Sequence, residues 1–304
     1  MINPPHTPWH AGERALQQSA NVLEKMEGIG SRVIRDHLLE QHQEFYPLLP
    51  FMVMGTVDAE GDAWATLRAG EPGFANASDA HHLQLNVSPD NTDPAQAGIG
   101  QGSAIGLLGI DLQTRRRNRL NGMIAQADER GLDIKVVQSY GNCPRYIHQR
   151  QFTFSRPAGQ PGSMPAQWMT HLDLQARALI ADAATFFVAS YVQGEDGQQQ
   201  IDVSHRGGNP GFVRVNADGS LTIPDYSGNF FFNTLGNLLV NPKSGLTFVD
   251  FSTGELLQMT GDARVELDSP HIARFEGAER LWHFTPRHIV RRADALPLRW
   301  VSGD

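Results

Sequence analysis

The chain has 304 residues, of which 40% are hydrophobic and 19% charged, so it is globular in composition and long enough for two domains or one large one. Its formal net charge of -8 argues against nucleic acid as the main partner, because duplex binding depends on clustered Lys and Arg. The single cysteine, Cys143, excludes an intrachain disulfide and a cysteine-based zinc site, and favours a reducing compartment. Because no secretory signal is visible from Met1 to His10 and no apolar run approaches the ~20 residues of a membrane span, we expect a cytoplasmic protein without a membrane partner.

The beginning of the chain has the apolar spacing of helices. Apolar residues recur on one side of the segment 13–26, which predicts a helix there. We expect this helix to end at residues 28–30, Gly-Ile-Gly, because glycine permits backbone reversal. A second helix is predicted from Ser31, which serves as its N-cap, and a third from Thr170.

An internal repeat occupies most of the remaining chain. Residues 70–74 are Gly-Glu-Pro-Gly-Phe and residues 208–212 are Gly-Asn-Pro-Gly-Phe. Other landmarks recur in the same order, and they pair 51–57 with 186–192, 58–61 with 194–197, 107–112 with 246–251, and Asn121-Gly122 with Thr260-Gly261. The repeated order predicts two copies of one unit, and the alternative is two unrelated β domains with similar turns.

Short apolar strands separated by Gly, Asp or Pro turns indicate antiparallel sheets that close, or nearly close, into small barrels. We therefore predict a mainly β protein with flanking helices (α+β). Two such barrels would pack as the subunits of a dimer do, with a ligand at the seam between them. The predicted domains are a helical segment over 1–45, a first barrel over 46–156, a linker and helix over 157–184, and a second barrel over 185–304.

The segment Asp202–Asn209 has the composition of an anion site. Ser204 offers a hydroxyl, Arg206 a planar fork of donors that can bind two phosphate oxygens, and two glycines let the backbone approach a ligand. Further donors follow at 225–229, Asp-Tyr-Ser-Gly-Asn, and at Asn233 and Asn237 on a predicted helix. The alternative is an ordinary loop in which Arg206 pairs with an acid.

The first copy differs at the matching position. Its stretch over 63–69, Ala-Trp-Ala-Thr-Leu-Arg-Ala, is more apolar, and it carries instead the basic run Arg115–Arg119. That run is either solvated surface or an anion site. Alternate residues of a strand face opposite sides, so some of these arginines would face the barrel or the seam. Cys143 is expected to be a small buried residue rather than a redox thiol. His81-His82 is expected to be an exposed pair, so no metal site is predicted.

Taken together, these segments resemble the pyridoxamine 5'-phosphate oxidase-like family of FMN-binding split barrels, in particular its tandem members. The resemblance covers most of the chain and implies six-stranded antiparallel Greek-key barrels with non-covalent FMN in the cleft between them. The segments that carry it are 9–14, 64–74, 114–122, 142–147, 202–212 and 224–242.

Carried over by position, the family's FMN contacts fall on a set of polar side chains: Ser204, Arg206, Ser227, Asn229, Asn233 and Asn237. The sequence departs from the true oxidases where their phosphate-binding Arg-Lys pair aligns with Asn233-Thr234. The phosphate would then depend on Arg206 or on an arginine of the 115–119 run. The oxidases' C-terminal substrate signature is also not evident over 291–300, which argues against pyridoxamine phosphate as the substrate.

The resemblance implies an FMN-dependent oxidoreductase acting on a small molecule, with the electrons supplied by a substrate or a reductase partner. We also consider a flavin carrier or redox sensor without turnover. A third alternative is a haem-binding split barrel, for which His205 is the candidate ligand. No residue stands out as a general acid or base, so no catalytic residue is predicted. The two barrels would form a pseudo-dimer within one chain, and a homodimer of chains stays open.

Overall fold

The computed structural model describes residues 7–160, 162, 164–194 and 197–303. The helices are α1 (Ala11–Ser19), α2 (Leu23–Val33), α3 (Glu40–Gln43), α4 (Leu174–Asp182) and α5 (Asn233–Val240), with short 3-10 turns η1 (Tyr46–Leu48), η2 (Pro94–Gly98) and η3 (Ile272–Arg274). The strands of the first half are β1 (Phe51–Val57), β2 (Ala63–Ala69), β3 (Ala75–Ala77), β4 (His82–Leu85), β5 (Ala104–Asp111), β6 (Arg116–Asp128) and β7 (Gly131–Gly141). Those of the second half are β10 (Thr185–Gln193), β11 (Gln199–Gly207), β12 (Arg214–Val215), β13 (Leu221–Tyr226), β14 (Lys243–Asp250), β15 (Glu255–Glu266) and β16 (Ala278–Arg292).

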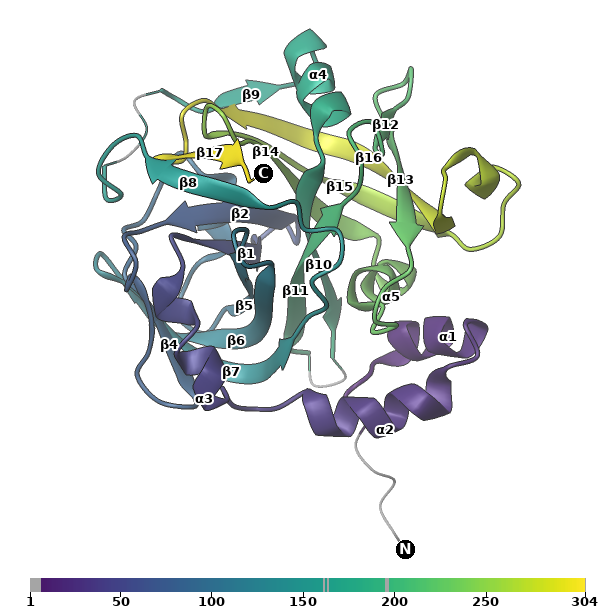
Figure 1. Ribbon diagram of the computed structural model, residues 1–304, viewed down its shortest axis with the longest axis horizontal. Coiled ribbons are helices and arrows are strands. Elements are labelled where there is room, and N and C mark those ends of the chain that lie inside the picture. Colours follow the sequence, from purple (N-terminus) through teal and green to yellow (C-terminus); the bar gives the residue numbers. More distant parts are fainter. Residues whose placement is uncertain (1–6, 161, 163, 195–196, 304) are drawn as a thin grey trace, which may run out of the picture.

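The two halves have the same topology. The first sheet runs in the order β2-β1-β5-β6-β7-β4-β3 and the second in the order β11-β10-β14-β15-β16-β13-β12, with all neighbours antiparallel. Both sheets are open along these paths, so the fold is the predicted pair of split barrels with flanking helices (Figure 1). The first sheet has one short strand, β3, beyond the six that the resemblance implies, and the second has two, β12 and a further strand that pairs with β16.

The strand register confirms the internal repeat, but it shifts the first strand by one residue from the predicted pairing. Met54 pairs with Leu107 and Val188 with Leu246, so 51–57 matches 185–191 rather than 186–192. Leu107 pairs with Leu120 in the first sheet, and Leu246 pairs with Met259 at the matching place in the second. Both Gly-x-Pro-Gly-Phe segments form the turn after the second strand of their sheet. Their final glycines, Gly73 and Gly211, have φ of 99° and 87°, values that glycine adopts without strain.

The halves meet at a seam whose two sides are related by pseudo-twofold symmetry. A Cβ atom added to Gly106 on β5 would lie 2.7 Å from the carbonyl oxygen of Ile201 on β11. The matching Gly245 on β14 approaches Ala63 on β2 in the same way, at 2.3 Å. Each half has its own apolar core, and a third core joins side chains of both, including Phe51 and Val53 from β1 with Phe187 from β10 and Val203 from β11.

Three further strands lie outside the shared strand order of the two halves. β17 (Leu298–Ser302), near the end of the chain, pairs with β8 (Arg150–Phe154), which follows the first sheet. β9 (Gln167–Met169) adds to β16 of the second sheet. Figure 1 shows β8 and β17 side by side across the top of the first half. The domain boundaries given above stay a prediction.

The N-terminal helices differ from expectation. The predicted helix over 13–26 is broken at residues 20–22, and Gly28 and Gly30 lie inside α2 instead of ending a helix. Gly30 is needed for packing, because a Cβ there would lie 2.6 Å from the Trp9 ring nitrogen. The helix predicted from Ser31 is wrong: the chain after Val33 is extended, since the backbone of Arg35 pairs with that of Ser139.

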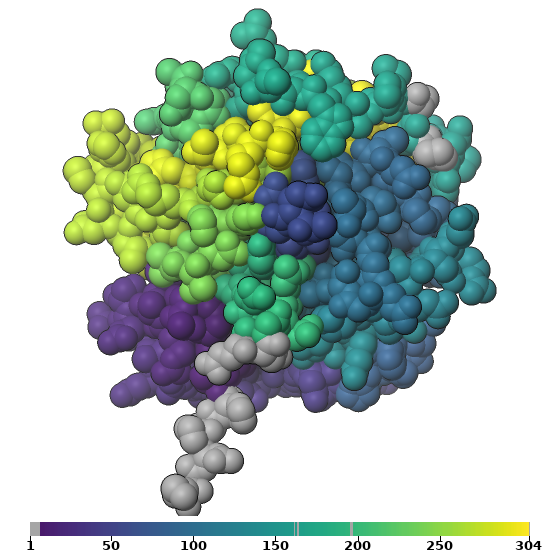
Figure 2. Space-filling model, turned by 180° about the vertical axis from the view of Figure 1, so that it is seen from behind, coloured from purple at the N-terminus to yellow at the C-terminus, as the bar shows by residue number. Residues whose placement is uncertain are grey.

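The other predicted helices are present. α4 begins after Asp173, whose side chain accepts a hydrogen bond from the backbone N–H of Ala176 (2.8 Å) and so caps the helix. α5 carries Asn233 and Asn237 as expected. In Figures 1 and 2, α1 and α2 lie beside the second half, next to α5, although they come first in the sequence.

Candidate functional site

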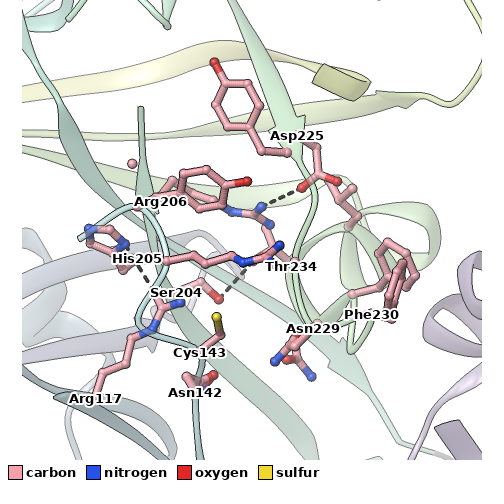
Figure 3. Close-up of a pocket in the computed structure, with 18 of the residues that line it drawn as sticks. Arg117, Asn142, Cys143, Ser204, His205, Arg206, Asp225, Asn229, Phe230 and Thr234 are labelled. Carbon is pink, nitrogen blue, oxygen red and sulfur yellow. Dashed lines mark hydrogen bonds and ion pairs between the residues drawn. The ribbon is translucent and has the colours of Figure 1, made fainter. Parts of the chain in front are cut away.

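A pocket that is partly open to solvent lies at the seam. We call it the seam pocket. The first half contributes side chains from β6 and from the loop after β7, and the second half contributes β11, the end of β13 and the start of α5 (Figure 3). The polar and aromatic side chains that line it are Arg117, Arg119, Asn142, Cys143, Arg145, Tyr146, Ser204, His205, Arg206, Asp225, Tyr226, Asn229, Phe230, Phe232, Asn233, Thr234 and Glu279.

Arginines dominate the charge of this lining. Arg117, Arg119, Arg145 and Arg206 face Asp225 and Glu279. The alternation within the 115–119 run explains the first two, because Arg117 and Arg119 share one side of β6 while the Arg116 guanidinium lies over the Phe45 ring, 4.9 Å from its centroid.

Arg119 is paired with protein groups through both of its terminal nitrogens, and only its Nε atom has no partner. One of its nitrogens donates to Asp202 (2.9 Å) and to the Tyr140 hydroxyl (3.0 Å), and the other donates to Ser204. Asp202 is also bound by Asn121 (2.9 Å). A buried guanidinium paired in this way is neutralised by its own network, so Arg119 fixes the position of Ser204 rather than supplying free positive charge.

Arg117 has no such partner. Its guanidinium donates to the imidazole of His205 (3.2 Å), and among the described residues no carboxylate pairs with it. Its Nε atom is buried without a hydrogen-bond partner. Burial, with the nearby positive charges of Arg119 and Arg206, lowers the pKa of Arg117 to about 10. Arg117 stays charged at neutral pH, and the seam pocket therefore holds a partly buried cation that no carboxylate of the described residues compensates.

His205 is locked as a neutral ring. Because a guanidinium can only donate, Nδ1 of His205 must accept from Arg117, which leaves the proton on Nε2 beside the Thr185 hydroxyl (3.5 Å). Burial, together with the charge of Arg117, holds the pKa of His205 well below its ordinary value. Both ring nitrogens are engaged, so a metal would have to displace Arg117 or Thr185 to reach this ring.

The sequence left open whether Arg206 belongs to an anion site or pairs with an acid, and its position in the structure allows both. It lines the seam pocket, and one of its nitrogens also donates to Asp225 (2.6 Å). Asp225 is shared with Arg280, at 3.2 Å. The Nε atom of Arg206 has no partner. Figure 3 shows Arg206 and Ser204 on the same strand, with Asp225 facing Arg206 from β13.

The structure brings most of the predicted contact residues together. Ser204, Arg206, Asn229 and Asn233 line the seam pocket. Two others do not. Ser227 lies next to it and accepts a hydrogen bond from the Tyr146 hydroxyl through its backbone carbonyl (3.0 Å). Asn237 is fully buried behind the pocket, where its amide donates to Asp202 and Ser190 (3.0 Å each).

An aromatic wall that the sequence did not indicate covers one side of the pocket. Tyr146 stacks on Tyr226 with ring centroids 5.5 Å apart and planes inclined by 30°. Tyr146, Phe230 and Phe232 have positive φ, at 64°, 63° and 59°. Bulky residues rarely adopt this conformation, and such strain gathers at ligand sites. Flat rings beside arginines suit a ligand that is itself aromatic and anionic.

A second polar cluster lies behind the seam pocket and joins it to α1. His10 contacts Asn237 (2.8 Å), and Glu13 accepts from Asn233 (2.6 Å) and from the His10 backbone (3.0 Å). Burial, reinforced by the charge of Asp202, raises the pKa of Glu13 to about 8. At neutral pH, therefore, a protonated carboxyl contacts Asn233, which lines the pocket. The motif at 9–14 was visible in the sequence, but its contact with α5 was not.

Cys143 corrects an expectation. It is a free, half-buried cysteine in the pocket lining rather than a small buried core residue. The reason is that β7 ends at Gly141, so Cys143 belongs to the loop that crosses the seam. His81 is exposed and His82 half-buried. No group of three or more His, Cys, Asp or Glu side chains that could hold a metal ion is found in the described part of the chain. Within the same residues, no helix is long and apolar enough to cross a membrane.

Neither a known protein family nor a curated protein matches the sequence. Solved structures do match, each at 14% identity. A Clostridium acetobutylicum protein of the pyridoxinephosphate oxidase family covers 42% of this chain with 92% of its own (TM-score 0.28). The FAD binding protein of Mycobacterium smegmatis covers 44% with 100% (TM-score 0.28). HutZ, the haem storage protein of Vibrio cholerae, covers 38% with 90% (TM-score 0.26).

Proposed function

We propose that the seam pocket binds FMN and that the protein is a flavoprotein. The observation that carries this proposal is Arg117, a partly buried guanidinium in the pocket lining without a carboxylate partner among the described residues. A buried unpaired charge is costly, and a ligand phosphate would remove that cost. Arg206 and the Ser204 hydroxyl line the same pocket and supply further donors.

The rest of the pocket suits the remaining parts of FMN. The amides of Asn229 and Asn233 and the thiol of Cys143 line it, and these are groups that can contact ribityl hydroxyls or ring heteroatoms. The stacked Tyr146 and Tyr226 offer a flat apolar surface. Ser227 and Asn237 drop out of the proposed contact set, because neither side chain lines the pocket.

We further propose that this flavoprotein is an oxidoreductase. The flavin, when bound, would supply the hydride or electron chemistry, and the described residues would hold and orient it. The pocket is partly open to solvent, so a small-molecule substrate or a reductase partner could reach it. A flavin carrier or redox sensor would need the same binding residues but no turnover. The haem alternative is less favoured, because both ring nitrogens of His205 are engaged.

The experiment compares FMN with riboflavin, which lacks the phosphate, by flavin fluorescence titration. Arg117→Gln should weaken FMN binding by about ten- to a hundredfold, since hydrogen bonds to a charged group contribute roughly 1.5–3 kcal/mol. Riboflavin affinity should not change. Arg115→Gln is the matched control, because Arg115 belongs to the same basic run but is exposed outside the pocket.

An absorption spectrum of the protein loaded with FMN, and separately with haem, accompanies the titration. Failure of the folded wild-type chain to bind FMN would refute the proposal. Tight haem binding with a shifted Soret band and no FMN binding would favour the haem alternative. Equal losses of FMN and riboflavin affinity in Arg117→Gln would mean that Arg117 does not contact the phosphate.

A further inference from the structure

The repeat places a counterpart of Arg206 in the first half. Met52 pairs with Arg68 in the first sheet, and Phe186 pairs with Arg206 at the same place in the second. Two residues earlier on these strands, Thr66 matches Ser204 in the same way. The serine and arginine that line the seam pocket therefore have equivalents, Thr66 and Arg68, on the other side of the pseudo-twofold axis.

The surroundings of the two arginines differ. Arg206 is 21% exposed and lines the open pocket. Arg68 is buried and contacts two carboxylates, those of Asp90 (2.9 Å) and Asp93 (3.4 Å). Arg292, from the second half, contacts the same two carboxylates, with Asp93 at 3.1 Å. Two arginines from opposite halves thus meet two aspartates at the counterpart of the seam pocket.

The Asp93 carboxylate accepts several hydrogen bonds from the protein. It accepts from the Thr66 hydroxyl (2.5 Å), the Gln258 amide (3.0 Å) and the backbone N–H of Ala95 (3.0 Å). The Asp93 side chain has no exposed surface. All these groups bind one anion, the Asp93 carboxylate, which belongs to the chain itself. The hydroxyl and one arginine come from the first half, and further polar groups come from the second.

The sequence explains why carboxylates occupy the site of the first half and not that of the second. Asp90 and Asp93 lie in the connection between β4 and β5. The matching connection of the second half, between β13 and β14, contains no Asp or Glu over 227–242, and it lines the open pocket with Asn229 and Asn233 instead. A cavity of about 530 Å³ remains beside Arg68, but residues of the first half alone line it.

We propose that the carboxylates of Asp90 and Asp93 occupy the anion position of a second seam site, so that one chain takes up one anionic ligand and not two. Asp93 completes the buried core of this closed site. Asp90 is partly exposed, at 27%, and covers it from the solvent side. The stoichiometry rests on the proposed FMN function, whereas the internal carboxylate site does not.

The first experiment is the FMN stoichiometry of the wild-type chain, by equilibrium dialysis at saturating FMN. One FMN per chain is expected, and two per chain would overturn the inference. If no FMN binds, the proposed function fails, and the second experiment alone decides whether the closed site exists.

The second experiment tests the closed site without FMN. Asp90→Ala leaves Arg68 and Arg292 with one carboxylate between them, so sodium acetate should raise the melting temperature of this variant more than that of the wild type. Sodium chloride at equal ionic strength controls for screening. Asp79→Ala, which removes an exposed carboxylate of the same half that pairs with His82, should gain nothing from acetate. An Asp90→Ala variant that acetate stabilises no more than the wild type would overturn the proposal.

Discussion

Gly12 on α1 lies directly against Gly236 on α5. A Cβ atom on Gly12 would be 2.1 Å from the carbonyl oxygen of Gly236, and a Cβ on Gly236 would be 2.7 Å from the Glu13 side chain. This close crossing lets Glu13 reach Asn233, which lines the seam pocket. The N-terminal helix is therefore part of the wall behind the candidate site.

Gly12→Ala should destabilise the protein because the added methyl group has no room between the helices. Overpacking typically costs about 1–3 kcal/mol, and urea unfolding would measure the loss. Gly28→Ala is the control, since a Cβ there meets nothing within 4 Å. In the middle of α2, that alanine should stabilise the helix by up to ~1 kcal/mol. Equal stability of Gly12→Ala and the wild type would show that α1 is not held against α5.

Glu13 should make stability depend on pH. Its pKa is about 8 in the folded chain against an ordinary value of 4.5, so between these values the folded state holds more protons than the unfolded state. Over that window the free energy of unfolding should fall as pH rises, by up to ~1.4 kcal/mol per pH unit. The contribution is complete below pH 4.5 and lost above pH 8.

Urea unfolding of the wild type and Glu13→Gln across this range measures the effect of Glu13. The variant should lack the part of the slope that Glu13 causes, while Glu24→Gln, at an exposed position on α2, should keep it. Parallel curves for the wild type and Glu13→Gln would mean that Glu13 does not retain its proton in the folded state.

Arg206→Ala should weaken FMN binding by about one to two orders of magnitude, from the loss of charge-assisted hydrogen bonds. Arg280→Ala is the matched control, because Arg280 shares Asp225 with Arg206 but is not part of the pocket lining. Isothermal titration with FMN would measure both variants. Comparable losses of FMN affinity in the two variants would mean that the effect comes from Asp225 rather than from a phosphate contact.

FMN bound in the seam pocket should be reducible by NADH, NADPH or a reductase, with negligible turnover of pyridoxamine phosphate. The reason comes from the resemblance: the oxidases' C-terminal substrate signature is not evident over 291–300, and their Arg-Lys pair aligns with Asn233-Thr234. Anaerobic bleaching of the flavin absorption with each donor, followed by reoxidation with candidate acceptors, tests this. Rapid oxidation of pyridoxamine phosphate would contradict the substrate argument, and a flavin that no donor reduces would favour the carrier or sensor.

The sheets were predictable because their signals are local. Apolar runs, turns and the repeated Gly-x-Pro-Gly-Phe segments each lie within a few residues, and the strand register follows from them. The N-terminal helices were predicted wrongly because Gly30 serves contact with Trp9 rather than chain reversal. Spacing alone also could not show that the Asn237 side chain turns away from the pocket toward Asp202.

The buried partners of the site lay beyond any local pattern. Glu13 and Asn233 are 220 residues apart in sequence, and nothing near either residue indicates the other. The alternation of the basic run did predict that some of its arginines face the barrel or the seam. Only the structure distinguishes Arg117, without a carboxylate partner in the described chain, from Arg119, which pairs with Asp202.

The shared strand order of the two sheets has a consequence for how this protein can change. In a homodimer of one-barrel chains, every substitution appears at both symmetry-related sites at once, because both are encoded by the same residues. Here the two sides of the seam are encoded separately, so aspartates can be gained beside Arg68 without touching Arg206. Joining the barrels in one chain therefore frees one site to become a structural element while its twin keeps an open pocket.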